Sequence, residues 1–253
     1  MEKTIQCVCK LPEDTNAAYE VSINENPRNM TPPSTLVTMW ANKTHTKFWA
    51  PGRTLRIAFL SGTQEFKDAV KSAANNWAPH INLTFDFVEG EEGEVRIESG
   101  SGNYWSCIGT DALLHPTGPT MSLTPYPHHG NFFAANVMHE FGHMLGAEHE
   151  QNHPLADIPW DRKAFYASHG LAEFPNEEED DYETVQKRKR VDQWYLDRLD
   201  PEETIHSPYD SLSIMHYEIR SEWTEDKRYR GINFELSEHD KAFMARAYPS
   251  PEA

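Results

Sequence analysis

Cysteine is scarce in this chain of 253 residues, which has three, at Cys7, Cys9 and Cys107. Small secreted domains that lack a large core are stapled by paired cysteines. An odd number of cysteines, two of them separated by a single residue, does not suit such a framework. We therefore expect no disulfide framework and interpret Cys107 as a buried free thiol.

Basic residues are also few. Lys and Arg number 23 against 40 Asp and Glu, so the formal net charge is −17. Binding to nucleic-acid phosphates needs clustered Lys and Arg, and so does binding to an anionic membrane surface. The composition therefore speaks against both nucleic acid and membrane as partners.

Long apolar runs are absent. No stretch approaches the 18 apolar residues of a membrane-spanning helix, and the first 20 residues lack the apolar region of a secretory signal. Unless the chain has been trimmed, we expect a cytoplasmic or unconventionally secreted protein. Its 7 Trp, 10 Tyr and 12 Phe nevertheless argue for a folded core rather than disorder.

The hydrophobic pattern of the chain changes near residue 49. Residues 1–48 are polar and irregular, which predicts an N-terminal extension with one short helix near residues 14–23. This extension would be a regulatory segment or a pro-segment. Residues 49–253 form the expected domain. Its predicted elements are a strand at 55–59, a helix at 66–77 capped by Thr63, strands at 83–88 and 94–98, a short edge strand at Met121–Leu123, a helix at 132–145 and a last helix from Ser237 to about residue 248.

The most informative segment is HEFGHMLGAEHE, which begins at His139. His139 and His143 are four residues apart on the expected helix, so their imidazoles project from one face. Gly146 supplies the freedom to leave the helix sharply, so that His149 can turn back toward the same point. Three neutral imidazoles suit Zn²⁺ and leave one coordination position open. Glu140 lies about 100° around the helix, within reach of a water there but not itself a ligand.

A second motif, Ser-Ile-Met-His-Tyr, ends at Tyr217. Together the two motifs resemble the metzincin metallopeptidases, whose long zinc motif is followed by a methionine-containing turn beneath the metal. Glu150 directly after the third His, the Met-His-Tyr turn, HEQNHP at 149–154 and Trp-Ser-x-Ile-Gly at 105–109 are similar to the astacin family. Without paired cysteines, the chain looks like the microbial, disulfide-free branch. The resemblance covers roughly residues 50–250.

The resemblance implies a role for each matching residue. His139, His143 and His149 would bind one Zn²⁺ per chain. Glu140 would act as general base and then as general acid, and Tyr217 would stabilise the oxyanion of the tetrahedral intermediate.

Two further residues have implied supporting roles. Met215 would form the hydrophobic base under the metal. Glu150 corresponds to the residue that meets the processed N-terminus in mature astacins.

The implied fold is α+β, a metzincin-type two-lobed catalytic domain with the zinc cleft between the lobes. The N-terminal lobe, residues 49–149, would hold a twisted, mainly parallel sheet with one antiparallel edge strand and two helices. The smaller, irregular C-terminal lobe, residues 150–253, would carry the Met turn and the last helix. A peptide substrate would lie antiparallel along the Met121–Leu123 edge. We expect a monomer.

The leading functional hypothesis is a zinc-dependent endopeptidase that uses a metal-activated water with Glu140 as base. An alternative is a catalytically silent metzincin-fold protein that binds a peptide or protein partner, although neither a ligand nor the Glu is missing. A third is another metzincin branch, against which the Met-His-Tyr turn speaks. We also consider that a thiolate of Cys7 or Cys9 occupies the open zinc position and keeps the enzyme latent.

Overall fold

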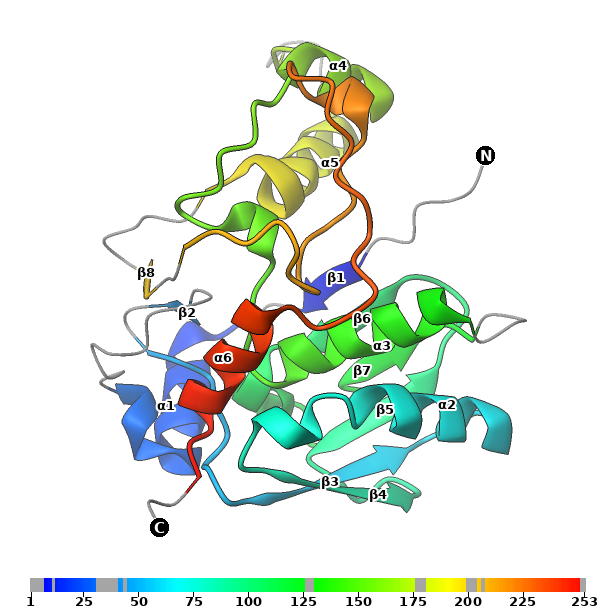
Figure 1. Cartoon of the computed structure of the whole chain (residues 1–253), viewed down its shortest axis with the longest axis vertical. Coiled ribbons are helices and arrows are strands. Elements are labelled where there is room, and N and C mark those ends of the chain that lie inside the picture. The colour runs from blue at the N-terminus through cyan, green and yellow to red at the C-terminus, as the bar shows by residue number, and fades with distance from the viewer. Residues whose placement is uncertain are drawn as a thin grey trace.

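The computed structural model describes residues 7–10, 12–30, 41–42, 45–125, 130–175, 181–198, 204–205 and 208–250. Its main sheet has six strands in the order β1-β6-β7-β5-β3-β4 (Figure 1). β3, β4, β5 and β7 are mutually parallel, β6 runs antiparallel to β7, and β1 runs parallel to β6. The predicted mainly parallel sheet is confirmed. The strands are β1 Cys7–Lys10, β3 Thr54–Phe59, β4 Thr84–Glu89, β5 Val95–Ser99, β6 Tyr104–Cys107 and β7 Met121–Leu123. A separate two-stranded sheet pairs β2 Ala41–Asn42 with β8 Thr204–Ile205.

The prediction that Met121–Leu123 is an edge strand is wrong. β7 pairs with β5 on one side and with β6 on the other, and Met121 lies opposite both Ile97 and Ser106. The prolines that suggested an edge, Pro119 and Pro125, lie outside the three paired residues, so their missing N–H groups cost no ladder hydrogen bond. The outer edge of β6 is in turn occupied by the backbone of β1, with Cys7 opposite Tyr104.

Two helices, α2 and α3, lie side by side over the sheet (Figure 1). In α2, Phe66, Val70 and Ala73 are buried as their spacing predicts, and Thr63 Oγ1 accepts the Phe66 N–H at 3.2 Å as an N-cap. The capping box at Ser237 and Asp240 that opens α6 is also confirmed. The helices are α1 Thr15–Glu25, α2 Gln64–Ala74, α3 Asn131–Met144, α4 Arg162–Ser168, α5 Tyr182–Val191 and α6 Glu238–Ala247. Short 3-10 helices are η1 Pro27–Met30, η2 Ala78–His80, η3 Gly109–Leu114, η4 Glu150–Asn152 and η6 Ser221–Trp223, and η5 Asp192–Leu196 is a π-helix.

Buried apolar side chains form two clusters, as a two-lobed domain requires. The first joins the sheet to α2 and α3, and it contains Cys107, which is buried as the sequence predicts. The second is formed by residues that fall between Ala156 and Trp223 in the sequence, and it includes Tyr217. Phe243 and Met244 of α6 belong to the first cluster, so the last helix packs into the core of the N-terminal lobe rather than of the C-terminal lobe. The Phe243 ring, for example, lies against Phe48, 5.8 Å between centroids.

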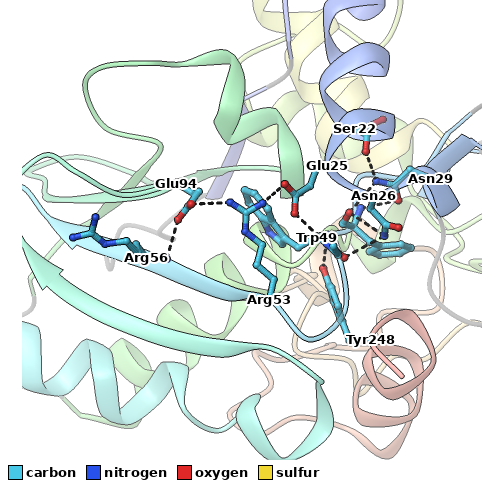
Figure 2. A network of polar contacts seen from close by, with 11 residues as sticks. Ser22, Glu25, Asn26, Asn29, Trp49, Arg53, Arg56, Glu94 and Tyr248 are labelled. Carbon is cyan, nitrogen blue, oxygen red and sulfur yellow. Dashed lines mark hydrogen bonds and ion pairs between the residues drawn. The ribbon is translucent and has the colours of Figure 1, made fainter. Parts of the chain in front are cut away.

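The N-terminal segment around α1 and η1 is packed onto the domain through buried amides (Figure 2). Asn29 is fully buried and donates to the carbonyls of Ser22 and Phe48, at 2.9 and 2.8 Å. Glu25 pairs with Arg53, which also bonds Glu94 at 2.7 Å. The boundary at residue 48 stays a prediction, and the Glu25–Arg53 ion pair crosses it.

None of the helices in the described ranges is both long enough and apolar enough to cross a bilayer.

Candidate metal centre

The helix that carries the motif, α3, is buried along most of its length. From Val137 to Met144 every residue is buried. α3 ends at Met144, and Gly146 follows with φ +95°, a conformation that a side chain would strain. The predicted sharp departure from the helix at Gly146 is thereby confirmed.

The last carbonyls of α3 are held by two aromatic side chains from distant parts of the chain. The indole Nε1–H of Trp49 donates to Met144 O at 2.9 Å, and the hydroxyl of Tyr248 donates to Leu145 O at 2.7 Å. Helix carbonyls at this end have no partner within the helix, so these bonds fix where α3 stops.

His139, His143 and His149 converge. One potential ligand atom from each lies within 4.8 Å of the others, and all three residues are buried. The Nε2 atoms of His143 and His149 are 3.0 Å apart. Nitrogen ligands at 2.0–2.1 Å around a tetrahedral Zn²⁺ are spaced by about 3.4 Å, so the triad fits such an ion.

The hydrogen bonds of the other ring nitrogens fix the tautomers. His139 Nδ1–H donates to Ile214 O, and His143 Nδ1–H donates to Ala147 O, each at 2.8 Å. A carbonyl only accepts, so both rings keep a bare Nε2. His139 Nε2 is buried without a hydrogen-bond partner among the described residues, as an atom reserved for a metal would be.

Burial also keeps the three rings uncharged. It lowers the pKa of His139 to about 4 and the pKa values of His143 and His149 well below the usual value, with the neighbouring imidazoles adding to the effect for the last two. Neutral imidazole is the form that binds a metal.

Glu140 follows His139 on α3, and its side chain is fully buried. Tyr217 arrives from the C-terminal lobe. Its ring centroid lies 4.2 Å from that of His149 and 5.9 Å from that of His139. The structure thus brings the three histidines and Tyr217 together from two segments about 70 positions apart, and it buries Glu140 beside His139 on the same helix.

The methionine turn lies against α3 at Gly142. A Cβ at this glycine would be 2.3 Å from Met215 Sδ, so any larger residue would displace the methionine side chain. The turn is held from α6, where the buried Asp240 accepts from Ser213 Oγ at 2.6 Å and from Ile214 N at 2.8 Å. Because Ile214 O receives the His139 N–H, Asp240 also helps to set that ring.

Glu150 begins the short η4 and is buried. Its Oε1 accepts the Asp210 N–H at 2.7 Å, while Oε2 has no hydrogen-bond partner among the described residues. Burial raises its pKa well above the usual value. No processed N-terminus meets Glu150 among the described residues, so that implied role stays a prediction.

Sequence reasoning missed the polar residues that hold the site, chiefly Gln151 and Asp240. Gln151 Oε1 accepts the Tyr217 N–H at 3.1 Å. The sequence carried a signal for it, since Gln151 and Asn152 are polar residues within a stretch that must be buried beside a metal ligand. The sequence pattern predicts Asp240 only as part of a capping box, whereas this carboxylate bonds the Met turn as well.

Comparison with known proteins gives matches only among solved structures. No family model and no protein with a curated description matches the chain. A structure of myroilysin is 32% identical, with a TM-score of 0.72, over 84% of this chain and 100% of that one. A second myroilysin structure is 28% identical, with a TM-score of 0.65, over 98% of this chain and 93% of that one. High choriolytic enzyme 1, a hatching enzyme zinc-protease from Oryzias latipes (medaka fish), is 16% identical with a TM-score of 0.48, over 76% of this chain and 88% of that one, which is too distant to support an argument.

Proposed function

The chain belongs to the astacin-like metzincin family of zinc metallopeptidases, in which myroilysin is a microbial member, and on that basis we propose that it is an endopeptidase with one Zn²⁺ per chain. The observation that carries the proposal is the convergence of three neutral imidazoles and the Tyr217 ring at one buried centre, with the buried Glu140 next to His139 on α3. A metal-binding site alone needs neither the carboxylate nor the phenol.

The residues divide the work of peptide hydrolysis between them. When bound to His139, His143 and His149, Zn²⁺ would polarise the scissile carbonyl and lower the pKa of a coordinated water toward about 7. The Glu140 carboxylate takes the proton from the attacking water and then delivers it to the leaving amine. The Tyr217 hydroxyl donates a hydrogen bond to the oxygen that gains negative charge.

The substrate is proposed to bind as an added strand on the outer edge of β6. β6 is the strand beyond β7, and its outer backbone is where β1 pairs in parallel. A peptide that pairs there replaces those hydrogen bonds with its own. Binding of substrate and pairing of β1 at that edge are therefore mutually exclusive.

The decisive experiment is the Glu140→Gln substitution. The amide keeps the size of the side chain but cannot accept a proton, so we expect cleavage of casein and of a peptide library to fall by about 10²–10⁴-fold. Zinc content, measured by atomic absorption, is expected to stay at one ion per chain.

Glu183→Gln, on the exposed first turn of α5, is the matched control and should cleave as the wild type does. Undiminished cleavage by Glu140→Gln, or cleavage that survives chelation, would contradict the mechanism. A wild type that binds zinc and peptide but cleaves none would instead favour a catalytically silent binding protein.

A further inference from the structure

The backbone of Tyr217 is held on both sides by buried side chains. Its N–H donates to Gln151 Oε1 at 3.1 Å, and its carbonyl accepts from His216 Nδ1 at 2.6 Å. Gln151 and His216 are 1% and 4% exposed, so neither bond competes with water. A peptide group fixed at both polar atoms has little freedom to rotate.

Each of the two side chains is itself anchored. Gln151 Nε2 donates to Trp194 O at 2.8 Å, in the π-helix η5. Because His216 Nδ1 carries the proton, its Nε2 accepts from the Tyr209 hydroxyl at 2.7 Å. The two anchors come from different segments of the C-terminal lobe, so the pose of Tyr217 is tied to that lobe.

The Tyr217 ring is also confined. It packs against His149, 4.2 Å away between centroids, and against Tyr195 of η5, 5.3 Å away. Gln151 therefore bonds the same π-helix that supplies the Tyr195 ring against Tyr217. One amide sets both the peptide of Tyr217 and the segment against which its ring rests.

The hydrogen bonds that hold the Tyr217 peptide group are connected directly to the metal ligands. Gln151 is two residues after His149, and Glu150 N between them donates to Met215 O at 3.1 Å. These bonds lock the segment 149–151 in register with the segment 215–217. A shift of either segment would change the position of the His149 imidazole relative to the Tyr217 phenol. A misplacement of about 1 Å is enough to lower the rate 10²-fold.

We propose that Gln151 and His216 are positioning residues, which hold the peptide of Tyr217 so that its phenol is directed to the oxyanion formed at the metal centre. The proposal rests on the proposed peptidase function. It assigns no contact with substrate to either residue, since both act through Tyr217.

The test is a double-mutant cycle between position 151 and position 217. Gln151→Met has a similar volume and removes both hydrogen bonds. Alone it is expected to lower kcat about 10–100-fold with KM nearly unchanged and one zinc retained, because oxyanion stabilisation is lost only in the transition state. In the Tyr217→Phe background the same substitution is expected to change kcat less than two-fold, since no hydroxyl remains to be positioned.

Asn152→Leu is the matched control. Asn152 Nδ2 donates to Gln193 O at 3.2 Å and to Asp197 O at 2.7 Å, so it holds the same π-helix without bonding Tyr217. If Asn152→Leu lowers kcat, it should do so by the same factor in the wild-type and Tyr217→Phe backgrounds. A second double-mutant cycle combines His216→Gln with Tyr217→Phe. This cycle tests the positioning role if Gln151→Met does not fold.

A readout without turnover is the ring signal of Tyr217 in a ¹³C,¹H spectrum, identified by its loss in Tyr217→Phe. The stacked imidazole of His149 shifts this signal, and Gln151→Met should move it toward the position of a free tyrosine while Asn152→Leu should not. Equal kcat losses in both backgrounds, or an unmoved Tyr217 signal, overturn the positioning role while peptidase activity stands. Absence of cleavage by the wild type overturns the proposed function itself, and with it this inference.

Discussion

At the scale of single residues, Gly142 shows how closely the metal helix and the methionine turn are fitted. A methyl group there would meet Met215 Sδ at 2.3 Å, and α3 is too well packed to withdraw. We expect Gly142→Ala to destabilise the protein by about 1–3 kcal/mol. Zinc affinity should fall as well, because Ile214, next to Met215, holds the His139 ring.

Thermal unfolding and competitive zinc titration would measure both effects. Gly102→Ala is the control, since a Cβ at Gly102 would meet nothing within 4 Å and its φ is not positive. If the two alanine variants unfold at the same temperature, the turn is not packed as tightly as described.

The ligands were readable from sequence because they lie within 11 consecutive positions and obey helix geometry. Glu140 follows from the same periodicity, and Tyr217 from the resemblance. Gln151 and Asp240 were not predictable in their roles, because what they bond lies 66 and 27 positions away. No local pattern reports a partner at that distance.

At the scale of elements, β1 lies where a substrate strand is proposed to bind. Removing residues 1–11 frees the outer edge of β6, so we expect the shortened chain to cleave peptides with a lower KM than the chain with β1. Steady-state kinetics on both proteins would show it. Equal KM values would mean that β1 does not compete with substrate.

The thiol hypothesis is separable from this strand effect. The side chains of Cys7 and Cys9 lie outside what the structure describes, although their backbone forms part of β1. The double substitution Cys7→Ser, Cys9→Ser keeps the strand and removes both thiols. A rise in kcat with this variant supports a thiolate at the metal, and unchanged activity contradicts it.

Strands and helices of the N-terminal lobe were predictable where alternation or a helical stripe ends at a cap or a proline, as in α2. The order of strands was not, because Met121–Leu123 carries the same signal whether or not another strand lies beyond it. The place of α6 was equally hidden, since the apolar residues of this helix could have packed in either lobe.

At the scale of the whole molecule, we expect folding to be coupled to zinc binding. A site of three buried imidazoles exists only in the folded state, so bound zinc stabilises by mass action, about 4 kcal/mol at a thousand-fold excess over Kd. For a chain of this size that corresponds to a Tm roughly 8–16 °C higher with zinc than after chelation.

Differential scanning calorimetry with and without chelator would measure this difference. His139→Ala is the control, because its Tm should hardly respond to zinc. A wild type whose Tm ignores both chelator and zinc would contradict a metal site at the three histidines.

The bonds at the end of α3 have a consequence for how the protein is made. All three histidines have been synthesised by residue 149, yet the carbonyls of Met144 and Leu145 gain both of their aromatic donors only when Tyr248 has arrived. Contacts of such long range form late, after a costly loop has closed. A nascent chain on the ribosome would therefore carry the complete zinc motif for about 100 residues of synthesis before the Tyr248 hydroxyl can bond the end of α3.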